Sequence, residues 1–122
     1  MKIFAILMLF CFISCQAQDF SSLWEEVKKW EGEQKYSEAL KGVESIYRKA
    51  VLEQNQEEWL KGLLRVVALK RGLHSYEQAV RFMMEEKWPT AKQQKAFTHL
   101  CYATTLMDYY HNDSWEINSR EK

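Results

Sequence analysis

The sequence predicts an all-α fold of about five antiparallel helices, arranged as two helical hairpins plus one further helix. Few residues interrupt helices, because the 122 residues include one proline, Pro89, and only four glycines. From Tyr36 to Val51 the apolar residues recur at steps of three and four, which is typical of a helix with one buried face. Strict alternation of apolar and polar residues is missing, so we predict no strand.

Residues 1–17 are predicted to form a secretory signal peptide that is removed from the mature protein. Lys2 supplies a positive charge, and Ile3 to Ile13 form an apolar run too short to span a bilayer comfortably. Small residues suited to cleavage follow, ending at Ala17. We therefore expect an exported protein whose helical domain covers residues 18–113.

Two ways of processing this leader, the predicted signal peptide, remain open. Cleavage after Ala17 would leave Cys101 as the only cysteine, a buried thiol without an internal disulfide framework. Alternatively, Phe12-Ile13-Ser14-Cys15 resembles a bacterial lipobox, although Phe12 stands where leucine is usual. Cys15 would then carry a lipid, and the protein would be anchored to a membrane.

The first hairpin is predicted from capping and turn residues. A helix over 19–30 has Ser22 and Glu25 at the spacing of a capping box, and Gly32 supplies a stop in the left-handed conformation. The link over 33–35 is short, which implies an antiparallel partner helix over 36–53. That second helix must be covered by the helices on either side of it.

The second hairpin follows the same logic. Asn55 and Glu58 form a capping box ahead of a helix with a wide apolar stripe that includes Trp59, and Gly72 is its predicted stop. Gly62 lies inside this helix at a cost of about 1 kcal/mol relative to alanine, which indicates close approach of a neighbouring helix. The partner helix is predicted to be capped by Ser75 with Gln78 and to end before Trp88-Pro89.

A fifth helix is predicted to start near Thr90 and Gln93. We expect its apolar residues to face the core; they are Ala96, Phe97, Leu100, Cys101, Thr104 and Met107, with Tyr110 or His111. Asn112 to Ser114 is predicted to be a turn, and residues 114–122 a tail or the start of a following segment.

A weak internal repeat relates the two hairpins. Tyr36, Ala39 and Leu40 recur forty residues later as Tyr76, Ala79 and Val80, and each set opens the second helix of a pair. The arrangement resembles the tetratricopeptide repeat (TPR), in which a small alanine lets two helices pack closely. Here the spacing exceeds the usual thirty-four residues, and the glycine that normally precedes the tyrosine is displaced.

No catalytic constellation is present in the sequence. The three histidines, His74, His99 and His111, lack the spacing of a metal motif, and there is no glycine-rich phosphate loop. The formal net charge is zero, which argues against a dedicated nucleic-acid binder. We predict a protein that is not an enzyme and carries no cofactor or metal.

Two sets of residues are candidates for an interaction surface. Trp30, Trp88 and Trp115 lie near predicted helix ends or turns, where aromatic residues can meet a partner, although core packing is the default. A basic patch on the third helix consists of Lys61, Arg65, Lys70 and Arg71, for which an ordinary charged outer face is the competing interpretation. Trp24 and Trp59 lie on apolar stripes and are predicted to be core residues.

The order of several motifs resembles the N-terminal region of alpha-2-macroglobulin-type surface proteins of Gram-negative bacteria. The matching segments are Asp19 to Trp24, Ser37 to Leu40, Ile46 to Ala50, Leu60 to Leu64, Tyr109-Tyr110 and Trp115. The resemblance implies a helical scaffold in the periplasm or at the outer-membrane surface, with neighbouring domains of a longer chain or an envelope protein as partners. Some members of that family trap proteases through a reactive thioester, but its Cys-Gly-Glu-Gln motif is absent here. The alternative is a free-standing TPR-like adaptor, exported or lipidated.

Overall fold

The computed structural model describes residues 19–120, so the predicted signal peptide and Cys15 lie outside the described residues. The described part is entirely helical and contains no strand, which confirms the all-α prediction. Its helices are α2 (Phe20–Gly32), α3 (Tyr36–Glu53), α4 (Gln56–Gly72), α5 (Tyr76–Glu85) and α6 (Lys92–Arg120).

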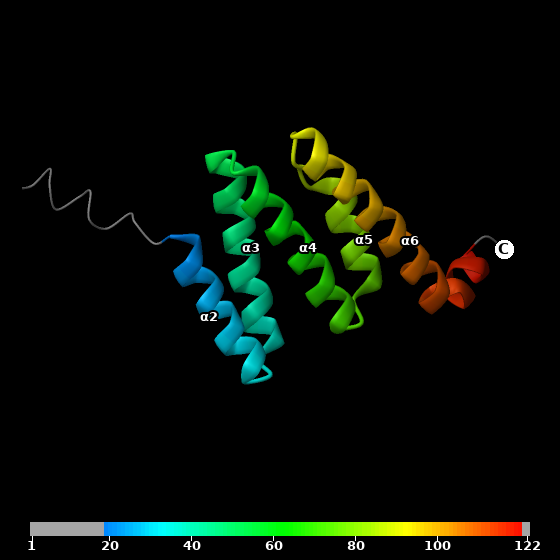
Figure 1. Cartoon of the computed structure of the whole chain (residues 1–122). Helices are drawn as coiled ribbons and strands as arrows, with labels where there is room; N and C mark the ends of the chain where they lie inside the picture. The colour runs from blue at the N-terminus through cyan, green and yellow to red at the C-terminus, as the bar shows by residue number, and fades with distance from the viewer. Residues whose placement is uncertain (1–18, 121–122) are drawn as a thin grey trace, which may run out of the picture.

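The helices lie side by side in chain order and alternate in direction, as Figure 1 shows. α3 packs against both α2 and α4, and α6 packs against both α5 and α4. The prediction that the neighbouring helices cover α3 is therefore confirmed.

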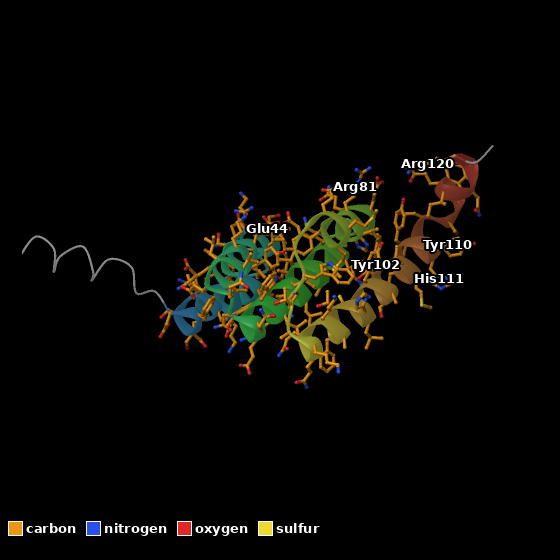
Figure 2. All side chains as sticks on the ribbon, turned by 90° about the horizontal axis from the view of Figure 1, so that it is seen from above. Glu44, Arg81, Tyr102, Tyr110, His111 and Arg120 are labelled. Carbon is orange, nitrogen blue, oxygen red and sulfur yellow. The ribbon has the colours of Figure 1, made fainter. Side chains whose placement is uncertain are left out.

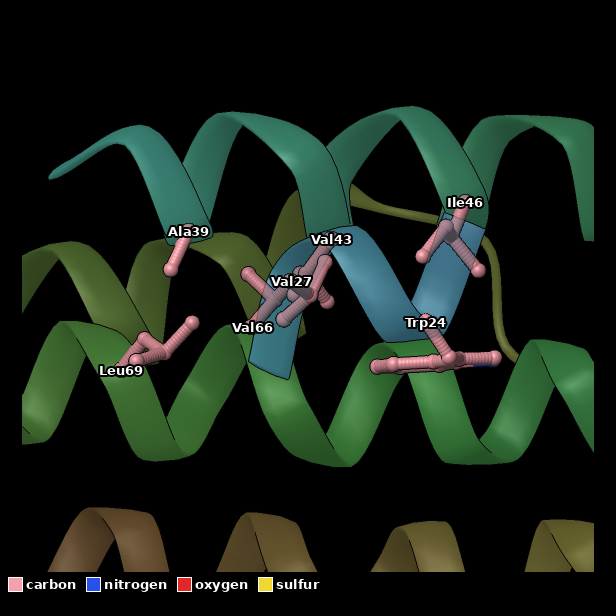
Figure 3. Close-up of a cluster of buried hydrophobic side chains, with 7 residues drawn as sticks. All are labelled: Trp24, Val27, Ala39, Val43, Ile46, Val66 and Leu69. Atoms are coloured by element: carbon pink, nitrogen blue, oxygen red, sulfur yellow. The ribbon is translucent and has the colours of Figure 1, made fainter. Parts of the chain in front are cut away.

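Two clusters of buried side chains form the core, and α3 and α4 contribute to both. The first cluster joins α2, α3 and α4 and is shown in Figure 3; it consists of Trp24, Val27, Ala39, Val43, Ile46, Val66 and Leu69. The second cluster joins α3, α4 and α5 and consists of Tyr47, Ala50, Trp59, Leu63, Val67, Ala79 and Met83. Trp24 and Trp59 are buried, as predicted.

The forty-residue repeat is visible in the geometry of the two hairpin turns. Gln34 and His74 each adopt the left-handed conformation, with φ of 60° and 58°. The amide of Lys35 donates to the carbonyl of Trp30, and the amide of Ser75 donates to that of Lys70, both at 2.8 Å. These are the hydrogen bonds of a Schellman motif, so the two turns are built alike.

α2 and α4 end at Gly32 and Gly72, as predicted, but the left-handed conformation expected of Gly32 is wrong, because neither glycine has a positive φ. Both glycines are the last residues of their helices, and the left-handed residue lies two positions further on, at Gln34 and His74. The position of that residue is set by where the Schellman hydrogen bonds close, and a non-glycine residue there accepts some backbone strain.

The repeat residues occupy equivalent places. Tyr36 opens α3 and Tyr76 opens α5, while Ala39 and Ala79 are both fully buried. Leu40 is half-buried and Val80 is 7% exposed, so both apolar partners face inward. Tyr36 itself is 44% exposed.

α3 and α4 approach each other closely at Gly62, as the sequence predicted. A Cβ atom at this position would lie 3.2 Å from the Cα of Tyr47, because the backbones of α3 and α4 come together here. The missing side chain at Gly62 therefore lets these two helices meet.

Of the N-terminal caps predicted for α2, α4 and α5, only that of α4 makes the predicted side-chain hydrogen bond. The side chain of Asn55 accepts a hydrogen bond from the amide of Glu58 at 3.2 Å, as predicted. The cap of α2 is Asp19, which accepts from the amide of Ser22 at 2.9 Å, so Ser22 lies inside the helix and the predicted cap there is wrong. Ser75 precedes α5 but makes no side-chain capping bond.

The predicted turn over 112–114 is also wrong, because α6 continues to Arg120. The Asn112 side chain donates back to the carbonyl of Asp108 at 2.8 Å, a bond compatible with helix. Arg120 pairs with Glu116 at 2.7 Å and with Glu77 of α5 at 3.8 Å, which ties the last turn to the rest of the protein. Asparagine, aspartate and serine lower helix propensity by only a few tenths of a kcal/mol each, roughly, and these contacts offset that cost.

Candidate functional site: the outward face of the last helix

Exposed apolar side chains are concentrated on α6. Six of the eleven exposed large apolar side chains among residues 19–120 lie on this helix: Phe97, Leu100, Leu106, Met107, Tyr110 and Trp115. Leu100 is 65% exposed and Met107 is 61% exposed. Large apolar residues gathered on one exposed surface indicate an interaction site more strongly than single scattered ones do.

The structure corrects the predicted orientation of α6. The residues buried against the other helices are Thr98 and Thr105, with Cys101 and Tyr102 half-buried beside them. Most of the predicted core face points away from the other helices. We call this surface the outward face of α6; it consists of Ala96, Phe97, Leu100, Ala103, Thr104, Met107 and Tyr110, all exposed.

Threonines can fill the inner face because their hydroxyl groups are satisfied within the helix. Thr98 donates to the carbonyl of Gln94 at 2.8 Å, and Thr105 donates to that of Cys101 at 2.7 Å. Each bond leaves the threonine methyl group free to pack against the core. The spacing of apolar residues alone therefore predicts burial of the more apolar face of α6, whereas the face that contains the threonines is the buried one.

The connector over 86–91 fixes how α6 is presented. The Gln56 side-chain oxygen accepts from the amides of Thr90 and Ala91, both at 2.9 Å, and so holds the approach to the helix. The carbonyl of Lys87 accepts from the Tyr47 hydroxyl at 2.5 Å and from the Trp59 indole at 3.1 Å. Helices α3 and α4 thus anchor the segment from which α6 starts.

Trp88 packs against the first half of α6. Its indole nitrogen donates to the carbonyl of Met83 at 2.7 Å. Its ring makes edge contacts with His99 and Tyr102, at centroid distances of 4.8 and 5.6 Å. Trp88 is therefore engaged with its own chain, on the side of α6 that faces the connector.

The other tryptophans proposed for an interaction surface differ in their placement. Trp30 is half-buried and packs on Gly42 of α3, where an added Cβ would lie 2.7 Å from its ring. Trp115 is 83% exposed near the end of α6, beyond the outward face. Figure 2 shows Tyr110 and His111 on the stretch of α6 that extends away from the other helices.

The outward face is flanked by charges but has none within it. From Ala96 to Met107 the sequence contains no aspartate, glutamate, lysine or arginine. Lys92 and Lys95 precede this stretch, and Asp108, Asp113 and Glu116 follow it. Depletion of charge at an exposed apolar centre is typical of protein interfaces. This run of uncharged residues is the signal by which the sequence could have identified the surface.

A concave feature lies between α2 and α4, where a cavity of about 700 Å³ is lined by both helices. Lys61 and Arg65 are at its edge. The Lys61 ammonium lies 4.5 Å from the Trp24 ring centroid, and Arg65 binds Glu31 through two hydrogen bonds of 2.5 and 2.8 Å. Both basic side chains thus link α4 to α2.

The rest of the predicted basic patch is engaged in the same way. Lys70 lies 3.7 Å from a carboxylate oxygen of Glu44 on α3, and Arg71 forms an ion pair with Asp108 on α6. The four basic residues of α4 therefore connect it to three neighbouring helices, and their charges are largely matched within the chain.

Metal binding and cysteine chemistry have little support in the described part of the chain. Among residues 19–120 there is no group of three or more histidine, cysteine, aspartate or glutamate side chains placed to hold a metal ion. Burial raises the pKa of the Cys101 thiol, which disfavours the reactive thiolate.

Residues 19–120 contain no helix long and apolar enough to cross a membrane. No family model, curated protein or solved structure matches the chain.

Proposed function

We propose that this chain is a non-catalytic helical scaffold that works by binding protein, and that the outward face of α6 is its binding surface. The observation that carries the proposal is the exposure of Phe97, Leu100, Met107 and Tyr110 on one uncharged helix face. Covering such a face with another protein removes apolar surface from water, which is the main driving force of association.

The anchoring of α6 also supports this role. The connector is held by Gln56, Tyr47 and Trp59. Two ion pairs tie α6 to its neighbours: Asp108 pairs with Arg71 of α4, and Arg120 pairs with Glu77 of α5. A surface on a rigid, well-anchored helix loses little conformational entropy on binding. The cavity between α2 and α4 is a weaker candidate, because Lys61 and Arg65 at its edge already interact with α2.

Export and family membership are further parts of the proposal and rest on the sequence alone. The leader supports export to the periplasm or the outer-membrane surface, and the motif order supports an N-terminal region of an alpha-2-macroglobulin-like envelope protein. A free-standing TPR-like adaptor is the alternative. Reading the gene beyond Lys122 separates them: a continuing macroglobulin frame supports the first, and an immediate stop codon contradicts it.

Site-specific photocrosslinking in cells tests the binding function. A photoreactive amino acid is placed at Leu100 on the outward face of α6, and in a matched control at Leu52, which is 85% exposed on α3. We expect position 100 to form crosslinks to protein and position 52 to form few or none. Equal crosslinking at both positions would contradict the proposed binding surface.

A further inference from the structure

We infer that the outward face of α6 binds the same face of a second copy of this chain, with the two α6 helices antiparallel. The inference rests on the proposed function and names the partner at the same surface. Three features of α6 carry it: the line of residues directed outward, the alternation of large and small residues along that line, and the charges at its two ends.

The outward line follows from the buried one. Thr98 and Thr105 lie seven residues apart and face the core. The residues on the opposite side of the helix recur at steps of four and three, the spacing of a seam between two packed helices. They are Ala96, Leu100, Ala103, Met107 and Tyr110, all exposed.

Large and small residues alternate along the first part of this seam, which favours one register. If Leu100 faces Ala103 of the second copy in an antiparallel pair, Met107 faces Ala96 of that copy. Each large side chain then meets an alanine, so the two helices can approach closely without leaving voids. A parallel pair instead stacks alanine on alanine and leaves gaps there.

The same register also pairs opposite charges. Lys92 comes to lie beside the seam opposite Asp113 of the second copy, and two-fold symmetry produces this pair twice. In a parallel pair Lys92 would lie near Phe97 instead, and Asp113 near Asn118. Because packing and charge select the same alignment independently, a second copy fits this face better than an arbitrary amphipathic helix.

Sedimentation velocity of the purified mature chain tests the inference. We expect the wild-type chain to sediment as a dimer and Leu100→Glu to sediment as a monomer. Leu100 is 65% exposed in the single chain, so this variant should keep its fold, which circular dichroism checks. Leu52→Glu on α3 is the matched control and should leave the dimer unchanged.

A charge swap tests the register. Lys92→Asp or Asp113→Lys alone places like charges together twice, and we expect dimer dissociation to become about tenfold easier. The double variant restores opposite charges and should recover wild-type affinity. If the dimer is weakened equally in the two single variants and in the double variant, the antiparallel register is overturned.

Failure of this inference can be told apart from failure of the proposed function. A monomeric wild-type chain overturns self-association, whatever the variants do. If Leu100 still crosslinks to a different protein in cells, the binding function holds and only the identity of the partner is wrong. If neither dimer nor crosslink forms, both proposals are wrong.

Discussion

The Tyr47 hydroxyl and the Trp59 indole nitrogen donate to one shared acceptor, the carbonyl oxygen of Lys87, at 2.5 and 3.1 Å. Tyr47 belongs to α3 and Trp59 to α4, so this carbonyl joins both central helices to the connector that leads into α6. The arrangement determines where α6 begins and therefore helps to decide which of its faces is turned outward.

Removing these donors should destabilise the protein. We expect Tyr47→Phe to lower the free energy of unfolding by about 1 kcal/mol, because Trp59 still satisfies the carbonyl. Combining Tyr47→Phe with Trp59→Phe should cost more than the sum of the single changes, since the acceptor then loses both partners. Urea denaturation measures all three variants, and Tyr36→Phe, at a 44% exposed position, is the control. Strict additivity would contradict the shared-acceptor account.

Alkaline pH should destabilise the protein through Tyr47. Burial, followed by the negative charge of Glu86, raises the pKa of Tyr47 to about 12. The ordinary tyrosine pKa is about 10, so the unfolded chain loses this proton at lower pH than the folded one. The associated stability is present below pH 10 and is lost progressively between about pH 10 and 12.

Comparison with Tyr47→Phe isolates that effect. The stability difference between wild type and variant, measured by urea denaturation, should shrink as the pH rises above about 10. A difference that stays constant up to the onset of alkaline unfolding would mean that Tyr47 titrates normally.

Gly62 and Gly72 should respond oppositely to alanine. Gly62→Ala places a Cβ atom 3.2 Å from the Tyr47 backbone, so we expect a net loss of about 1 kcal/mol despite the better helix propensity. A Cβ at Gly72 would have no neighbour within 4 Å, and Gly72→Ala should stabilise the protein by about 0.5 kcal/mol. Thermal denaturation shows whether each substitution stabilises or destabilises the protein. Stabilisation by both would rule out a tight contact between α3 and α4.

The left-handed turn at Gln34 should prefer glycine. At this position, where φ is 60°, the glycine variant should be more stable than the alanine variant by about 1 kcal/mol. The order should reverse at Lys41, an exposed residue within α3, where alanine is the better helix former. Chemical denaturation of the four variants checks this, and the same order at both positions would contradict the turn geometry.

The number of helices and their approximate positions could be predicted from the sequence because each has a strong local signal. Asn55 with Glu58 marked the start of α4 correctly, and the apolar spacing of α3 identified the helix that the others cover. Such features depend on residues within a few turns of one another, which is the range over which sequence patterns are reliable.

The rotation of α6 could not be predicted in the same way. It depends on Gln56, Tyr47 and Trp59, which lie more than twenty-five residues before the connector segments they bind. Thr98 and Thr105 also look polar in the sequence, yet their hydroxyl groups are satisfied by the helix itself. The apolar spacing therefore assigns the candidate binding surface to the core, and only the tertiary contacts show that it is exposed.

The most direct test of the central claim, that a second copy of this chain covers the outward face of α6 in solution, is methionine oxidation measured by mass spectrometry. Met84 on α5 and Met107 on α6 are 67% and 61% exposed in a single chain, so they should react with peroxide at similar rates if nothing covers either. We predict that Met107 reacts several-fold more slowly than Met84 in the purified wild-type chain, and that Leu100→Glu makes the two rates similar. Equal rates in the wild-type chain would contradict the account.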